Sequence, residues 1–149
     1  MSHNRHPFRI VHPVEDDVLR QAAALKLART RRSLDWLLRR DAPGAALFRE
    51  ARADQMIVAV DVATGEPVGI VTWQKDRRDV FITRQGEFSA LYGAVGGRLR
   101  LWTYTLLRQM VAPWRSPYVN TLWVEPGWRP RGAGIQLMRA ATATIEGRF

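Results

Sequence analysis

The sequence predicts an α/β fold, and three patterns support this prediction. β-branched, apolar runs such as Met56–Val62 are typical of buried strands. Other stretches, such as Leu99–Met110, carry apolar residues at helical spacing. Near the end of the chain an apolar strand leads through a glycine-rich loop into a helix, which is an α/β arrangement. Because the chain has 149 residues, the size of one common domain, we expect a single domain over residues 1–149.

The first 53 residues predict one strand followed by helices. Phe8–Val11 is an apolar run that ends before Pro13, which cannot donate to a strand ladder. Acidic residues then open a helix predicted over Glu15–Arg31, where they suit the helix dipole. Ser33 is a suitable N-cap for a second helix, and a third helical segment is predicted over Ala45–Ala53.

A hairpin follows these helices. The predicted strands are Met56–Val62 and Val68–Trp73, and Thr64–Glu66 forms the turn between them. After a charged exit at Lys75–Asp79, the glycines of Val80–Pro117 predict a loose first half for that region. The second half of the same region predicts the amphipathic helix Leu99–Met110, ended by Pro113.

The last part of the chain predicts a strand and a helix with a glycine loop between them. Tyr118–Val124 has the composition of a strand, and Pro126-Gly127 closes it. Apolar residues at helical spacing from Arg131 onward predict the last helix.

Composition excludes several kinds of site. The chain has no cysteine, so disulfides, thiolate zinc sites and a cysteine nucleophile are excluded. His3, His6 and His12 lie in the first twelve residues, where we favour a solvated tail over a His–carboxylate metal site and predict no metal. No run approaches the ~20 apolar residues of a membrane span, and Met1–Arg9 lacks an apolar signal core. We therefore expect no membrane partner and a cytoplasmic location.

The formal net charge of +9 has three interpretations. It would suit nucleic acid, an anionic cofactor or an ordinary solvated surface. The arginines are spread along the chain, and neither a helix-turn-helix pattern nor a basic aromatic strand motif is present. Nucleic acid is therefore the partner that we rank last.

The segment Thr121–Ile135 carries the strongest functional signal. Gly132 and Gly134 lack side chains, so a ligand can approach the backbone there. The first amides of the following helix have no partner inside the helix, which makes its start suitable for phosphate. Arg129 and Arg131 add charge and forked donors. The Gly-Lys-Ser/Thr end of a P-loop is absent, as are the third glycine and downstream acid of a dinucleotide fingerprint.

The pattern Arg129-x-x-Gly132-x-Gly134 resembles the Gln/Arg-x-x-Gly-x-Gly/Ala signature of the GNAT superfamily of N-acetyltransferases. Leu122–Pro126 resembles the fourth strand of that family, Phe8–Asp16 its first strand and turn, and Gly65–Trp73 its second hairpin. These matches occur in the family's order and cover most of the chain. The region of about 80–117 fits only as a helical insertion between the third and fourth strands.

The resemblance implies a mixed, mostly antiparallel sheet with flanking helices and acetyl-CoA as co-substrate. In the family the pyrophosphate sits on the loop amides, and the pantetheine arm bonds the backbone of the fourth strand. A small-molecule or peptide amine attacks the thioester directly, while a strand amide stabilises the oxyanion. The cofactor-binding residues implied for this chain are Leu122, Trp123, Val124, Arg129, Pro130, Arg131, Gly132, Ala133, Gly134 and Ile135.

Two departures from the family pattern affect these expectations. Pro130 lies in the phosphate loop and has no N–H. The family continues with a fifth strand and a fourth helix, whose tyrosine often serves as general acid, whereas this sequence ends at Phe149. We therefore expect a C-terminally short fold, which is either a truncated form or fragment, or a chain whose sheet a partner chain or a second copy completes. The alternative function is a truncated or catalytically inactive module for CoA binding or subunit interaction.

No catalytic base is assigned from the sequence. Glu125, Glu87 and Asp79 are considered, but solvated turn and loop charges are the favoured interpretation for all three. Four residues of the insertion are interpreted as core packing in preference to an acceptor pocket: Trp102, Tyr104, Leu106 and Leu107. Trp73 and Trp123 are expected in the core, and Trp128 is expected to be exposed.

Overall fold

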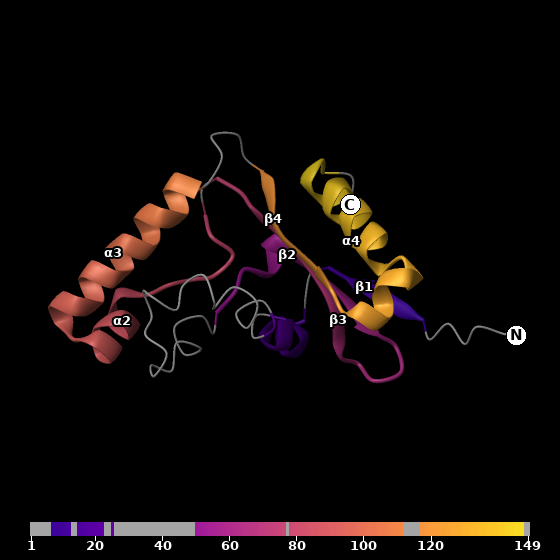
Figure 1. The fold of residues 1–149 in the computed structure, drawn as a ribbon, viewed down its shortest axis with the longest axis horizontal. Helices are drawn as coiled ribbons and strands as arrows, with labels where there is room; N and C mark the ends of the chain where they lie inside the picture. The colour runs from indigo at the N-terminus through magenta and orange to yellow at the C-terminus, as the bar shows by residue number, and fades with distance from the viewer. Residues whose placement is uncertain are drawn as a thin grey trace, which may run out of the picture.

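A four-stranded antiparallel sheet is the centre of the fold (Figure 1). The structure, a computed structural model, describes residues 7–12, 15–22, 25, 50–76, 78–111 and 117–147. The sheet order is β1-β2-β3-β4, from the strands β1 (Phe8–Val11), β2 (Met56–Asp61), β3 (Pro67–Gln74) and β4 (Tyr118–Val124). The prediction of an α/β fold with an antiparallel sheet and flanking helices is confirmed, and every strand pair among the described residues is antiparallel.

The β2–β3 hairpin closes through a turn that its sequence encodes. Gly65 has a φ of +73°, in the left-handed region that favours glycine. The Gly65 amide donates to the Asp61 carbonyl at 2.8 Å. The Asp61 carboxylate accepts the Ala63 amide at 3.0 Å and the Thr64 hydroxyl at 3.2 Å. The predicted turn is therefore correct, because side chains and backbone both satisfy its donors.

The segment just before β2 differs from the prediction. Residues 16–22 are helical, as expected, whereas the predicted helices within residues 26–49 lie outside the described residues. A helix was expected to reach Ala53, but Ala51 instead forms an antiparallel bridge with Phe81. The Arg52 amide donates to the Val80 carbonyl at 2.8 Å. Residues 50–52 thus pair with a distant segment, and only the short 3-10 helix η2 (Ala53–Gln55) follows.

The glycine-rich start of the insertion is helical, not loose. It forms α2 (Gln85–Tyr92), and the next helix is α3 (Ala94–Val111). Gly93 ends α2 with a φ of +80°, and its amide bonds the Ser89 carbonyl. A Cβ on Gly97 would stand 2.5 Å from the Phe88 carbonyl oxygen. These two glycines therefore make the joint and the close contact of a helical hairpin.

Two apolar cores cover the two faces of the sheet. The helix α4 (Ala133–Ile145) lies on one face and the helical residues 16–22 lie on the other, whereas α2 and α3 stand to one side of the sheet and contribute side chains to the second core (Figure 1). The core beneath α4 includes Ile57, Val71, Trp73, Val124 and Leu137. The core on the opposite face includes Val18, Met56, Ile70, Phe88 and Tyr104, with Trp123 packed against it. Trp73 and Trp123 thus pack as predicted.

The outer face of α3 carries apolar residues that the described chain leaves exposed. Trp102 was expected in the core, but it is 62% exposed, and Leu106 is 40% exposed. Tyr104, on the opposite face of the same helix, is buried as expected. Helical spacing identified an apolar stripe but not the surface that meets it. Among the described residues, no helix combines the length and hydropathy needed to cross a bilayer.

Candidate functional site

A groove of about 650 Å³ lies between β4 and α4. Six of the ten residues implied by the resemblance line it: Leu122, Val124, Arg129, Gly132, Gly134 and Ile135. The groove is formed where the chain leaves β4, turns through the 3-10 helix η3 (Pro126–Arg131) and enters α4. The strand–glycine–helix motif therefore opens on a real cavity.

The turn into α4 depends on Gly132. Its φ of +79° and ψ of 13° are left-handed, and no side chain caps the helix there. The first hydrogen bond of α4 runs from the Gln136 amide to the Gly132 carbonyl at 3.1 Å. The amides of Ala133, Gly134 and Ile135 come before this bond, so they have no acceptor within the helix. Gly134 and Ile135 line the groove, so their amides bring the positive end of the helix dipole to its edge.

The start of α4 lies beside the end of β4 at Gly134. A Cβ on Gly134 would lie 3.6 Å from Cγ2 of Val124, an ordinary van der Waals distance, whereas a Cβ on Gly132 would meet nothing within 4 Å. Packing alone therefore does not require glycine at position 134, but its lack of a side chain leaves the backbone open to the groove. Gly132 is needed for its backbone conformation, and the space around it is open.

Arg129 connects the strand to the helix start. Its Nε donates to the Val124 carbonyl at 3.0 Å, which ties η3 to the last residue of β4. The rest of its exposed guanidinium lines the groove. A guanidinium held through one nitrogen keeps its remaining donors for an anion.

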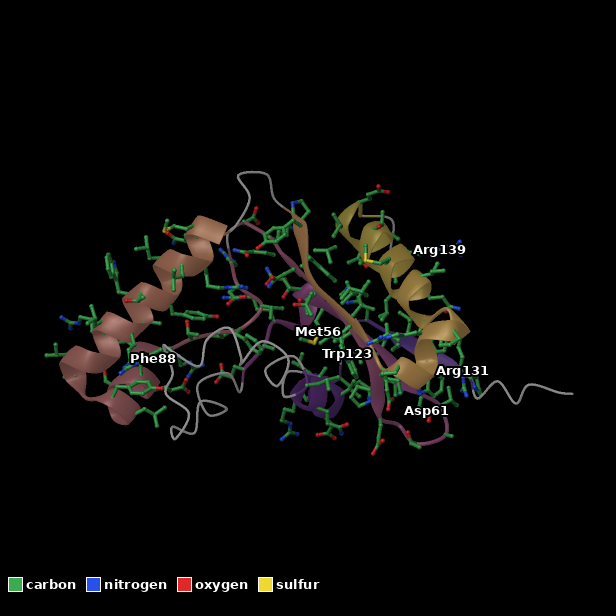
Figure 2. The ribbon with its side chains drawn as sticks, viewed as in Figure 1. Met56, Asp61, Phe88, Trp123, Arg131 and Arg139 are labelled. Atoms are coloured by element: carbon green, nitrogen blue, oxygen red, sulfur yellow. The ribbon has the colours of Figure 1, made fainter. Side chains whose placement is uncertain are left out.

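Four implied residues do not line the groove. Arg131 is exposed and stacks on the Trp128 ring at 4.5 Å, while Pro130 is exposed beside it. Ala133, the first residue of α4, is fully buried in the core beneath that helix. Trp123 packs on the opposite face of the sheet. In Figure 2 Arg131 and Arg139 lie along η3 and α4, across the sheet from Phe88.

Trp128 is half-buried, so its expected exposure was wrong. It packs against the core beneath α4, and its ring meets Phe8 edge-to-face with centroids 6.0 Å apart. The contact joins η3 to β1, at the far edge of the sheet.

The far half of the groove was missed in the sequence. It is lined by Met138, Arg139, Thr142, Ala143 and Glu146. With Ile135, these residues follow i, i+3 and i+4 spacing, so they share one face of α4. Extending that spacing from Ile135 would have found them. From Gly132 to Glu146 the face is about 20 Å long at the rise of an α-helix.

The groove is basic at the helix start and apolar along its length. Leu122 is 46% exposed and Ile135 is 62% exposed, so both present apolar surface to a ligand. Arg129 and Arg139 supply positive charge. Among the described lining residues, Glu146 supplies the carboxylate, and it lies at the opposite end from Gly132. This arrangement suits a long, mostly apolar ligand with an anionic group at one end.

The three carboxylates considered as bases are Glu125, Glu87 and Asp79. None of them is among the described residues that line the groove. Asp79 is no solvated loop charge, because it accepts the Tyr104 hydroxyl and the Arg108 Nη2, the latter at 2.7 Å. Glu87 lies in the first turn of α2, and Glu125 is exposed before η3. The structure brings none of them to the helix start.

The Asp79 cluster has shifted ionisation. Burial raises the pKa of the Tyr104 phenol, and the adjacent Asp79 carboxylate raises it further against a smaller opposing effect of Arg108. Burial alone would lower the pKa of the Arg108 guanidinium, but the charge and hydrogen bond of Asp79 raise it overall. Tyr104 and Arg108 therefore keep their protons, and Arg108 forms an ion pair with Asp79 on the side of the sheet opposite α4.

His12 departs from the predicted solvated tail. Its Nδ1 lies 3.1 Å from the Met56 carbonyl, and its ring is 6.0 Å from that of Trp73. His3 and His6 lie outside the described residues.

Comparison with known proteins leaves the groove as the basis for assigning function. No protein-family model matches the chain, and the search of curated proteins found no significant match.

Proposed function

We propose that this chain is an N-acetyltransferase that binds acetyl-CoA in the β4–α4 groove and transfers the acetyl group to an amine. The observation that carries the proposal is the start of α4. The amides of Gly134 and Ile135, which have no acceptor within the helix, open together with Arg129 on a groove whose lining continues as apolar surface. An anionic head and a long, mostly neutral arm are the two parts of CoA.

Each part of the groove has a role in this proposal. The pyrophosphate binds the amides of Gly134 and Ile135, where the helix dipole favours negative charge. Arg129 donates to the same phosphates from the end of β4. The pantetheine arm lies along Leu122 and Val124, whose exposed surface it covers.

The reaction needs no covalent enzyme intermediate. The amine attacks the thioester carbonyl directly, a C–N bond forms, and the C–S bond breaks to release CoA thiolate. The proton lost by the amine passes through water to this thiolate, so that the products are the amide and free CoA. A backbone amide of β4 stabilises the tetrahedral oxyanion. Holding both reactants in one groove supplies much of the rate. A small-molecule amine and a peptide amine both fit this chemistry.

Calorimetric titration with CoA and acetyl-CoA tests the proposal. We expect saturable binding to the wild-type chain and at least a tenfold loss in Gly132→Asp, because a carboxylate would then face the pyrophosphate. Gly132→Asn is the matched control, since asparagine tolerates the left-handed backbone and has nearly the same shape without the charge. It should bind within about threefold of wild type.

Two results would overturn the proposal. One is a wild-type chain that gives no heat with either ligand at high micromolar concentration. The other is equal affinity in Gly132→Asp and Gly132→Asn, because CoA would then bind elsewhere.

A second candidate function is CoA binding without turnover. It is favoured by the position of Glu146, the carboxylate among the described lining residues, which lies about 20 Å along α4 from Gly132. In addition, β4 has a strand neighbour on one side only within the described part of the chain. An edge strand of this kind can pair with a partner chain or a second copy. CoA release measured with a panel of amines separates the two functions, because the second predicts binding with no release.

A further inference from the structure

A second, smaller hollow lies on the face of the sheet opposite the groove. It has a volume of about 200 Å³ and lies between α3, Arg52 and residues 78–83. Phe81 and Tyr104, which line it, belong to the core on the α2–α3 face. Its polar lining includes Arg52, Arg78, Arg108, Thr83 and Gln109. We call this hollow the arginine pocket.

Long-range backbone pairing brings the arginines together. The Arg52 amide donates to the Val80 carbonyl at 2.8 Å, and the Ile82 amide donates to the Glu50 carbonyl at 2.9 Å. The Arg52 side chain is also directed, because its Nε donates to the Asp79 carbonyl at 3.2 Å. Arg108 comes from α3, 29 residues away from Asp79. Three separate segments therefore converge on one cavity.

Both carboxylate oxygens of Asp79, which lines the arginine pocket, already accept hydrogen bonds. One oxygen of Asp79 accepts the Tyr104 hydroxyl. The other accepts the Arg108 Nη2 at 2.7 Å and the Val80 amide at 2.8 Å. Asp79 therefore neutralises Arg108, and its orientation is fixed by three donors.

The charges of Arg52 and Arg78 are not neutralised in the same way. Among the described residues, the ion pairs join Arg20 to Asp17, Arg84 to Glu50 and Arg108 to Asp79. Among the described residues that line the arginine pocket there are three guanidinium groups and one carboxylate, which leaves two positive charges in excess within this set. Two like charges that face one cavity repel each other, and a bound anion removes that cost.

We propose that the arginine pocket binds a small oxyanion group, a phosphate or a carboxylate. Guanidinium forks match the geometry of both groups, and each fork can donate two hydrogen bonds. The Arg52 fork keeps its Nη donors after Nε has bonded the Asp79 carbonyl. Thr83 and Gln109 supply neutral donors at the rim. The volume holds several water-sized groups, enough for a tetrahedral oxyanion.

This site does not depend on the proposed function. The arginine pocket lies on the α2–α3 face, and the groove lies on the α4 face. Loss of CoA binding and loss of oxyanion binding are therefore separate outcomes, measured with different variants.

Titration of the ¹⁵N-labelled full chain with inorganic phosphate, and separately with acetate, tests the site. The Nε–Hε signals of Arg52 and Arg78 should shift saturably. Arg78→Gln removes one guanidinium from the pocket lining, so it should weaken the phosphate affinity at least fivefold. Because Arg78 is exposed, the substitution should leave the fold intact. Arg98→Gln removes a comparable exposed charge from α3 outside the pocket and should change the affinity less than twofold.

Two further comparisons show which oxyanion binds and whether it binds at the arginine pocket or at the start of α4. Saturation by acetate as well as phosphate identifies a carboxylate-accepting site, whereas saturation by phosphate alone identifies a phosphate site. Phosphate affinity at the arginine pocket should persist in Gly132→Asp, which disables the helix start of α4. Shifts that increase linearly without saturation, or equal affinities in Arg78→Gln and Arg98→Gln, would overturn the inference.

Discussion

The Tyr104 phenol is held in its protonated form by the groups around it. Tyr104 is 4% exposed, and its hydroxyl donates to the Asp79 carboxylate. Deprotonation would place a second negative charge beside Asp79 in a buried site, which burial and like charge both oppose. The raised pKa of Tyr104 therefore makes the stability of the fold depend on pH in the alkaline range.

Whether stability rises or falls with pH depends on which state, folded or unfolded, keeps the phenol proton. The phenol of the unfolded chain titrates near pH ~10, whereas the raised pKa keeps Tyr104 protonated in the folded state well above that pH. The unfolded state then binds fewer protons, so stability falls as pH rises above ~10. Between pH ~9 and ~11 this residue should cost about 1 kcal/mol.

Tyr104→Phe is the matching test. Chemical denaturation at both pH values should show the wild-type chain losing about 1 kcal/mol more stability than the variant over this interval. The other tyrosines are common to both chains and cancel in the comparison. A variant that loses as much stability as the wild type would show that Tyr104 ionises normally in the folded chain.

At the scale of elements, the α2–α3 hairpin depends on a contact without side chains. The two helices cross where Gly97 meets the backbone of Phe88 and Ser89. Gly96, one residue earlier, faces only the Cβ of Tyr92, at 3.7 Å from an added Cβ. The two neighbouring glycines therefore have different roles in the same helix.

Alanine at these two positions should have opposite effects. Gly97→Ala places a Cβ 2.5 Å from backbone atoms, so the helices must separate, and we expect a loss of about 2 kcal/mol. Gly96→Ala meets no close atom and gains helix propensity, so it should be neutral or stabilise by up to about 1 kcal/mol. Thermal and urea unfolding of both variants measure the difference. Equal stabilities would mean that the helices do not approach as closely as the structure shows.

At the scale of the whole molecule, local sequence patterns predicted most of the described sheet. Phe8–Val11 and Tyr118–Val124 have the predicted bounds, whereas β2 is one residue shorter than predicted and β3 is one residue longer at each end. These strands are short β-branched runs between turn residues, so their signal is contained in neighbouring residues. The glycines at 93 and 97 misled the prediction because their roles come from a helix crossing, which a local pattern does not reveal.

The functional sites also include one part that the sequence predicted and one that it did not. The helix start at Gly132 was predictable, because strand, glycines and helix are consecutive in sequence. The arginine pocket was not, since Tyr104 and Asp79 are 25 residues apart and Arg52 and Asp79 are 27 residues apart. Trp102 shows the same limit, because periodicity marks an apolar face without identifying what packs on it.

The arrangement of the two cores predicts which part of the molecule opens first. Met56 to Val60 are at most 1% exposed, and β2 is paired on both sides. In contrast, among the described elements α3 packs mainly on α2, and its outer face leaves Val95 83% exposed and Met110 74% exposed. Opening the hairpin therefore exposes less buried apolar surface than opening the sheet, and local stability follows that surface.

Native-state hydrogen exchange measures this difference directly. We expect the amides of β2 and β3 to exchange only through global unfolding, and those of α2 and α3 to exchange with an opening free energy at least about 1 kcal/mol lower. Gly97→Ala should lower the protection of the hairpin further while leaving the exchange of β2 and β3 tied to global stability. Equal opening free energies in the hairpin and the central strands would show instead that the molecule unfolds as one cooperative unit, with α3 held by contacts beyond its packing on α2.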